Sequence, residues 1–377
     1  MRRVLVPAFA VLVLAACSDA VDDPDTPGRD GQTRAELADA ARRVNAAVFT
    51  RPPAREAEER GVESGVPLAP GQTPPPDVAA PPIAPQPSDP VVTRAQVLLD
   101  RAGFSPGVID GRYGENVRQA VAAYERAKGL TVDGELDAAV FAALTAADPA
   151  PAMTAYVITA EDVAGPFVGS VPQDLETLAT LPRVGYADAR EALAERFHMD
   201  PDLLSELNPG VDFARAETTI TVTDPGRSGG FTAARIEVDK AERAVRAFDA
   251  EGRLLAFYPA SIGSESRPAP DGTVTVEAVA PDAAYYYDPA RLTWGTAQTR
   301  LKIAPGPNNP VGGIWIDLSA EGYGIHGTPE PEKVGKTFSH GCVRLTNWDA
   351  RELSRAVKAG VPVVFLGART ETGRGAP

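Results

Sequence analysis

The sequence predicts a multidomain protein in which a small three-helix unit and an α/β module precede a larger, mainly-β domain. The length of 377 residues suggests two or three domains. The spacing of apolar residues changes from helical to alternating near Phe231. Of the 36 prolines, 12 lie within residues 52–90, ahead of all three units. The net charge of -14 excludes the basic surface that a nucleic-acid-binding protein needs to neutralise phosphates.

The first residues are organised like an export signal. Arg2-Arg3 precedes a short apolar run, which is too short to cross a bilayer as a mature helix. Two interpretations of Cys17 stay open: an incidental cysteine behind an ordinary signal peptide, or a residue that is lipidated after cleavage. The ending Leu14-Ala15-Ala16-Cys17 resembles a bacterial lipobox. That resemblance implies a signal peptide over 1–16 and a lipid anchor on Cys17.

Residues 17–90 are predicted to form a disordered, proline-rich tether. The stretch 52–90 favours extended polyproline II and cannot build a packed core. Ahead of it, Thr33–Phe49 has the apolar spacing of one short helix. We therefore expect the folded part of the protein to be held at a distance from the anchor.

Residues 91–146 are predicted to form the three-helix unit. Asp110-Gly111 returns 23 residues later as Asp133-Gly134, and each turn signal is followed by apolar residues at helical spacing. The segment resembles the peptidoglycan-binding domain family found on cell-wall enzymes, with two departures. Val117 and Val140 stand where a helix-starting threonine is usual, and Glu125 stands where a glutamine is usual. The resemblance implies binding to the wall, and the alternative is a spacer that no longer binds sugar or peptide.

Residues 150–228 are predicted to be an α/β module made of two helices followed by a strand. The helical stripe around Leu193 and a second one around Leu204 precede a strand at Thr218–Val222. The order of these elements resembles a LysM module, which implies contact with N-acetylated glycan. The stretch 147–229 holds 14 acidic and only 5 basic side chains. His198, within the helix pair, is predicted to lie at a boundary rather than to act as a catalyst.

Short alternating strands begin at Phe231 and predict a β-rich domain over 231–367. The segment 234–238 alternates apolar and polar side chains, and the segments 244–248 and 254–258 are short, mainly apolar runs. Turn residues at 249–252 separate the last two segments with hairpin spacing. Residues 368–377 are predicted to be a flexible tail.

A single window of this domain concentrates the reactive side chains. Cys342 is a nucleophile once it becomes a thiolate, and a nearby imidazole or cation favours that form. Gly341 permits a tight backbone, which exposes the sulfur and aims amides at a developing oxyanion. The residues of the window with such chemistry are His326, Ser339, His340, Gly341, Cys342 and Arg344.

Three interpretations of this window compete. The first is a cysteine nucleophile with a histidine as its base. The second is a zinc site formed by His326, His340 and Cys342 with one open position, although His-x-Cys is an awkwardly close pair for one ion. The third is a buried, inert cysteine with two incidental histidines. The residues alone favour the nucleophile and do not choose between the two histidines as base.

The block Ser339-His340-Gly341-Cys342-Val343-Arg344, with His326-Gly327-Thr328 before it, resembles the L,D-transpeptidase catalytic domain of the YkuD type. The resemblance covers about 231–367 and implies a β-sandwich-like domain that acts on peptidoglycan stem peptides. It implies Cys342 as nucleophile and His326 as proton acceptor and donor. His340 and Ser339 would shape the site, while Arg344 and the amides of Gly341 and Cys342 would hold substrate and oxyanion. It implies neither metal nor cofactor.

These expectations combine into an exported cysteine-dependent L,D-transpeptidase that releases D-alanine and forms wall crosslinks. Its expected partners are stem peptides, glycan and, through the lipid anchor, a membrane. Ser18 after the lipidated Cys17 resembles a signal for the outer membrane, so the enzyme is expected on the periplasmic side, facing the wall. The alternatives are an L,D-carboxypeptidase, an enzyme that attaches or releases a wall-linked lipoprotein, and a passive anchor between wall and membrane.

Overall fold

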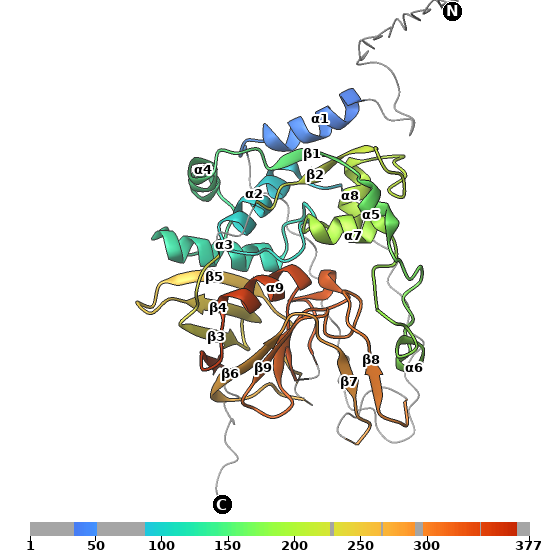
Figure 1. Ribbon diagram of the computed structural model, residues 1–377. Coiled ribbons are helices and arrows are strands. Elements are labelled where there is room, and N and C mark those ends of the chain that lie inside the picture. Colours follow the sequence, from blue (N-terminus) through green and yellow to red (C-terminus); the bar gives the residue numbers. More distant parts are fainter. Residues whose placement is uncertain are drawn as a thin grey trace, which may run out of the picture.

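The computed structural model describes residues 34–50, 87–226, 230–264, 267–290, 297–339 and 341–367. Figure 1 shows the helical units of the N-terminal half lying over one side of a β-rich domain. The predicted signal peptide, Cys17, most of the predicted tether and the predicted tail lie outside the described residues. Within the described ranges, no helix combines the length and the apolar character needed to cross a membrane.

The short helix predicted over Thr33–Phe49 is present as α1 (Arg34–Asn45), and it interrupts the disordered tether predicted over 17–90. Ala40 and Val44, one turn apart, are buried in the core of the middle module. The side chain of Asn45 exchanges two hydrogen bonds with the backbone of Met153, at 2.8 and 3.0 Å. A helix that buries an apolar face and satisfies a strand end belongs to the folded body.

The three-helix unit consists of α2 (Pro90–Arg101), α3 (Glu115–Lys128) and α4 (Ala138–Ala147). Its two Asp-Gly turns are held in the same way. Gln96 Oε1 accepts from the amide of Gly111 at 2.8 Å, and Glu125 Oε2 accepts from the amide of Gly134 at 2.8 Å. The carboxylate of Glu125 thus makes the bond that an amide oxygen makes at the other turn, so the unusual glutamate leaves this turn intact.

The middle module is built on a two-stranded antiparallel sheet, with Tyr156 paired with Ile220. The second strand covers the predicted segment 218–222, shifted by one residue. Residues 165–188 leave this module and run along the β-rich domain. The elements in chain order are β1 (Met153–Val157), α5 (Ala160–Ala164), α6 (Leu175–Leu178), α7 (Ala189–Arg196), α8 (Pro201–Leu207) and β2 (Thr219–Thr223).

The β-rich domain contains one eight-stranded mixed sheet in the order β11-β10-β9-β6-β12-β3-β4-β5. Its elements are β3 (Arg235–Asp239), β4 (Ala244–Phe248), β5 (Leu254–Pro259), β6 (Gly272–Ala280), β7 (Tyr285–Tyr287), β8 (Leu301–Ile303), β9 (Trp315–Leu318), β10 (Gly324–His326), η1 (Pro331–Lys333), β11 (Val343–Arg344), α9 (Asn347–Ala356) and β12 (Pro362–Leu366). The chain that continues from β5 bridges back to β11 through Ser261 and Arg344. The two edges of the sheet therefore meet, which leaves β11 with neighbours on both sides.

The three units are joined by buried contacts rather than by free linkers. Phe257 of β5 is buried in the core of the three-helix unit, and its backbone exchanges 2.9 Å hydrogen bonds with Gly103 and Ser105. The predicted boundary residue His198 stacks on Trp348 of α9, with ring centroids 5.0 Å apart. Helix α9 is therefore the element on which all three units converge (Figure 1).

The buried carboxyl of Asp349, on α9, makes this junction sensitive to pH. Ser105 donates to its Oδ2 at 3.0 Å, and burial raises its pKa well above the ordinary value. A carboxyl whose pKa is raised on folding stabilises the fold below its unfolded pKa, and this contribution is lost as the pH rises through the folded pKa.

We expect Asp349→Asn to raise the melting temperature by several degrees at pH 8 and by less at pH 5. Thermal unfolding across this range tests it, and a destabilised variant at pH 8 would contradict it.

Candidate active site

Two adjacent parallel strands bring the reactive residues to one face of the sheet. Val343 of β11 pairs with Ile325 of β10, and both side chains are buried in the core. Alternation along a strand then directs Cys342, Arg344 and His326 to the opposite face. Arg344 is directly paired with His326 in this register. His326 and Arg344, which are separated by 18 positions, thus meet because the strands pair.

The loop before β11 fixes the position of the thiol. Gly341 has a φ of 116°, in the region that favours glycine, and a Cβ there would lie 3.2 Å from the ring of Tyr323. The buried hydroxyl of Ser339 donates to the carbonyl of Cys342, and the amide of Gly341 donates to Ser339 Oγ at 3.3 Å. Ser339 therefore acts as a brace across the turn that carries the cysteine.

The thiol of Cys342 is partly buried, and its Sγ lies 3.8 Å from the carbonyl oxygen of Gly322. Burial raises its pKa, while a backbone hydrogen bond from Gly324 and the positive charge of Arg344 act in the opposite direction. Burial is the largest of these effects, so the resting group is a thiol at neutral pH. Its attack on a substrate then needs a base.

His326 has the properties of that base. Its Nδ1 lies 2.6 Å from the carbonyl oxygen of Gly327. Because a carbonyl only accepts, Nδ1 carries the proton and Nε2 has a free lone pair. Burial, assisted by the charge of Arg344, lowers the pKa of His326 to about 3. The imidazole is therefore neutral at physiological pH and able to take a proton.

An indole ring that sequence reasoning missed supports His326. Trp315 of β9 pairs with His326 across the antiparallel ladder, and the rings stack with centroids 5.6 Å apart at 20°. Gly324 makes room for the indole, because a Cβ at this position would lie 2.4 Å from it. The indole Nε1 donates to Asp317 Oδ1 at 3.0 Å, which fixes the ring. Strand alternation from Trp315 to Asp317 was the available sequence signal.

These residues line a cleft of about 1930 Å³. Cys342, His326, Ser339 and Arg344 line one side. The other side comes from the β7–β8 hairpin and from α6 of the middle module, which share a small apolar core around Leu175 (Figure 1). The contribution of α6 had no signal in the sequence, because its partner hairpin lies more than 100 residues away.

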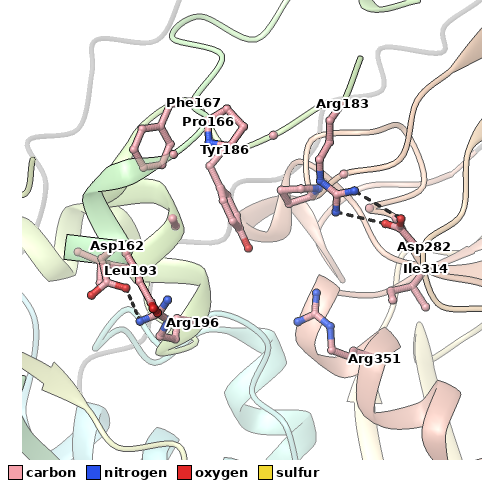
Figure 2. A pocket seen from close by; sticks show the side chains of 18 of the residues that line it. Asp162, Pro166, Phe167, Arg183, Tyr186, Leu193, Arg196, Asp282, Ile314 and Arg351 are labelled. Atoms are coloured by element: carbon pink, nitrogen blue, oxygen red, sulfur yellow. Dashed lines mark hydrogen bonds and ion pairs between the residues drawn. The ribbon is translucent and has the colours of Figure 1, made fainter. Parts of the chain in front are cut away.

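A second, smaller cavity of about 340 Å³ lies between the middle module and the β-rich domain (Figure 2). Tyr186 and Arg351 line it from opposite sides, and it does not contain the cysteine. The ion pairs at its wall are Arg183–Asp282 at 3.2 Å and Arg196–Asp162 at 2.6 Å. This cavity marks the interface through which the middle module contacts the catalytic half of the chain.

The remaining predicted site residues are placed differently. His340 and Cys17 lie outside the described residues. In the part of the chain that the structure describes, no group of three His, Cys, Asp or Glu side chains is arranged to hold a metal ion. His198 lies away from the cleft, with its Nδ1 2.8 Å from Asp100 Oδ2.

Two family models match the chain. Residues 233–365 match the YkuD family, described as "L,D-transpeptidase catalytic domain", and residues 88–144 match the family described as "Putative peptidoglycan binding domain". The predicted resemblances to these two families are thereby confirmed, and so is the mainly-β character of the catalytic domain next to a helical unit. Neither model covers the middle module, so the LysM resemblance stays a prediction.

Curated relatives give the same picture. The "Putative L,D-transpeptidase YkuD" of Bacillus licheniformis is 28% identical over 46% of this chain and 90% of its own length. The "Putative L,D-transpeptidase YqjB" of Bacillus subtilis is 31% identical over 30% of this chain and 61% of its own length. The "Probable L,D-transpeptidase ErfK/SrfK" of Salmonella typhimurium is 28% identical over 47% of this chain and 59% of its own length. The chain thus spans less than two thirds of the last two relatives.

Among solved structures, an L,D-transpeptidase from Xylanimonas cellulosilytica is 18% identical, with a TM-score of 0.32, over 76% of this chain and all of that one.

Proposed function

We propose that this chain, with its YkuD-type L,D-transpeptidase catalytic domain and its peptidoglycan-binding domain, crosslinks peptidoglycan stem peptides through a thioester on Cys342. The observation that carries the proposal is the shared face of β10 and β11, where a thiol and a neutral imidazole lie in the wall of one large cleft. A cleft of this size accommodates two peptide strands, as a transfer between them requires.

In the first step the sulfur of Cys342 attacks the carbonyl carbon of the third stem residue, a diamino acid linked to D-alanine. Nε2 of His326 takes the thiol proton and gives it to the leaving amine, so the C–N bond breaks and free D-alanine departs. In the second step a side-chain amine of a neighbouring stem attacks the thioester. The C–S bond breaks, the proton returns to sulfur through His326, and a new amide remains.

Arg344 is suited to hold a carboxylate during these steps. Its side chain lines the cleft, and its Nε is buried without a hydrogen-bond partner among the described residues. A buried guanidinium N–H without a partner is costly, and a substrate carboxylate would satisfy it. We propose that Arg344 binds the D-alanine carboxylate of the donor stem. After D-alanine has left, Arg344 would bind a carboxylate of the acceptor stem.

The test uses defined tetrapeptide muropeptides with the product masses as readout. Crosslinked dimer together with free D-alanine is the expected result. Loss of D-alanine without dimer would identify a carboxypeptidase, in which water captures the same acyl-enzyme. Transfer only to a lysine-containing lipoprotein peptide would identify an enzyme that attaches lipoproteins to the wall.

We further propose that the protein is exported and anchored by lipid on Cys17, on the periplasmic side of the outer membrane. The charged and apolar start followed by Leu14-Ala15-Ala16-Cys17 supports this proposal. Two acyl chains anchor firmly where one is marginal. We expect Cys17→Ser to move the protein from the membrane fraction to the soluble fraction of the producing cell. A mature N-terminus without added lipid mass would contradict the anchor.

A further inference from the structure

We propose that Glu195, on helix α7 of the middle module, is a positioning residue that sets the orientation of His326 through Asn347. This inference deepens the proposed function and rests on it, since His326 matters only as the base for Cys342. Glu195 lies outside residues 233–365, which match the catalytic domain, and it is connected to the active site through a series of hydrogen bonds.

The chain begins at a single peptide unit, the one between Gly327 and Thr328. Its carbonyl oxygen, on Gly327, lies 2.6 Å from Nδ1 of His326. Its N–H, on Thr328, donates to Oδ1 of Asn347 at 2.8 Å. Because a peptide unit is planar and rigid, holding the N–H in place also holds the carbonyl that orients the imidazole.

Asn347 has almost no freedom to move. It is the first residue of α9 and only 1% exposed. Two glycines leave space for its side chain, since a Cβ on Gly312 would lie 1.9 Å from Oδ1 and a Cβ on Gly327 would lie 2.2 Å from it. The amide can still turn about its last bond, which would exchange oxygen for nitrogen and present a donor to the N–H of Thr328.

Glu195 determines which way this amide faces. Its Oε2 accepts from Nδ2 of Asn347 at 2.7 Å, so the nitrogen is drawn toward α7 and the oxygen is left facing Thr328. Its Oε1 accepts from the hydroxyl of Tyr186 at 2.8 Å. The carbonyl of Pro307 also accepts from Nδ2, at 3.2 Å, which is a longer bond to a neutral acceptor.

The surroundings of Glu195 show that its carboxyl is an acceptor held in place rather than a solvated charge. Burial raises its pKa, whereas Asn347, Tyr186 and the charge of Arg351 favour the ionised form, and Glu191 opposes it. Tyr186 and Arg351 both line the cavity between the two units (Figure 2). The middle module therefore contributes the shorter of the two hydrogen bonds that Nδ2 of Asn347 donates, while the catalytic domain supplies the longer one through the carbonyl of Pro307.

The test uses a reaction that needs the base but not the peptidoglycan substrate. The full chain is mixed with p-nitrophenyl acetate, and the burst of p-nitrophenolate that accompanies acylation of Cys342 is followed from pH 5 to pH 11. We expect Glu195→Leu, which keeps the volume but removes the acceptor, to slow the burst about 10-fold at pH 7. The difference should vanish at high pH, where the thiolate forms without a base.

Two variants make the result specific. Glu195→Gln keeps an acceptor for Asn347 and is expected to restore the burst. Arg183→Ala removes another contact between the middle module and the catalytic domain, the ion pair with Asp282 at 3.2 Å, and is expected to leave the burst unchanged. An equal loss in Arg183→Ala, a loss that is the same at every pH, or no loss in Glu195→Leu would each overturn the proposal.

Folding and the assigned reaction are checked separately. If Glu195→Leu does not fold, Tyr186→Phe is used instead, because it removes the donor to the other carboxyl oxygen of Glu195. This variant should slow the burst by a smaller factor, with the same dependence on pH. A Tyr186→Phe burst equal to that of the wild type overturns the proposal. A wild-type protein that shows the burst but makes no muropeptide dimer contradicts the crosslinking function and leaves the positioning role standing. A folded wild-type protein without any burst overturns both.

Discussion

Replacing Cys342 by alanine is expected to abolish acyl transfer and to leave the fold unchanged. Removal of a covalent nucleophile costs about 10⁴-fold to 10⁶-fold in rate, because no other group can form the acyl-enzyme. The thiol is only partly buried and its Sγ lies a long 3.8 Å from the oxygen of Gly322, so alanine loses little packing. The measurement is dimer formation from tetrapeptide muropeptides, together with thermal unfolding of the variant.

Cys342→Ser is the matched control. Serine keeps the size of the side chain and its contacts, but its hydroxyl is a far weaker nucleophile unless a base removes the proton efficiently. We expect the serine variant to bind donor peptide with unchanged affinity and to form no covalent adduct that mass spectrometry detects. Crosslinking by either variant would mean that Cys342 is not the nucleophile.

Much of the catalytic domain could be predicted from its local sequence. The segments predicted as strands at 244–248 and 254–258 lie within β4 and β5, and the segment predicted at 234–238 overlaps β3. The two short, mainly apolar runs on either side of the turn at Asp249–Gly252 carry this information, because a hairpin is a local structure. The block around Cys342 was also visible, since six reactive or permissive residues stand close together in the chain.

The parts that could not be predicted depend on pairing between distant segments. The parallel register of β10 and β11 places Arg344 beside His326, and no local pattern specifies it. The stack of Trp315 on His326 needs that sheet and the missing side chain of Gly324. The bond from Glu195 to Asn347 joins positions 152 residues apart. Composition suggested a tether before residue 90, yet Ala40 and Val44 of α1 are buried against the middle module.

The contacts between units change how the domain order is understood. The sequence suggests independent domains joined by flexible linkers, each with its own function. Phe257 of the sheet lies in the core of the three-helix unit, and α6 of the middle module lines the catalytic cleft. Under the proposed function, these contacts would hold the three-helix unit at a fixed distance from the cleft that binds the stem peptide.

Replacing His326 by alanine is expected to slow acylation of Cys342 by about 10²-fold to 10⁴-fold at pH 7. The thiol has a raised pKa and is protonated there, so it depends on the neutral imidazole to accept its proton. The loss should shrink as the pH rises through the pKa of Cys342, since the thiolate then forms without the base. The wild-type rate should stay level from pH 8 down to pH 5, because a pKa of about 3 keeps His326 neutral throughout.

The lowered pKa of His326 also predicts how the folding stability depends on pH. The unfolded chain binds a proton on His326 below about pH 6.5, whereas the folded chain does not until about pH 3. Folding stability is therefore lost as the pH falls between these two values, and His326→Gln should reduce this acid loss. Burst kinetics of His326→Ala and thermal unfolding of His326→Gln, each compared with the wild type over pH 4–8, measure the two effects. An acid limb near pH 6.5 in the wild-type rate would contradict the lowered pKa of His326, and an unchanged rate in His326→Ala would assign the role of base to another group.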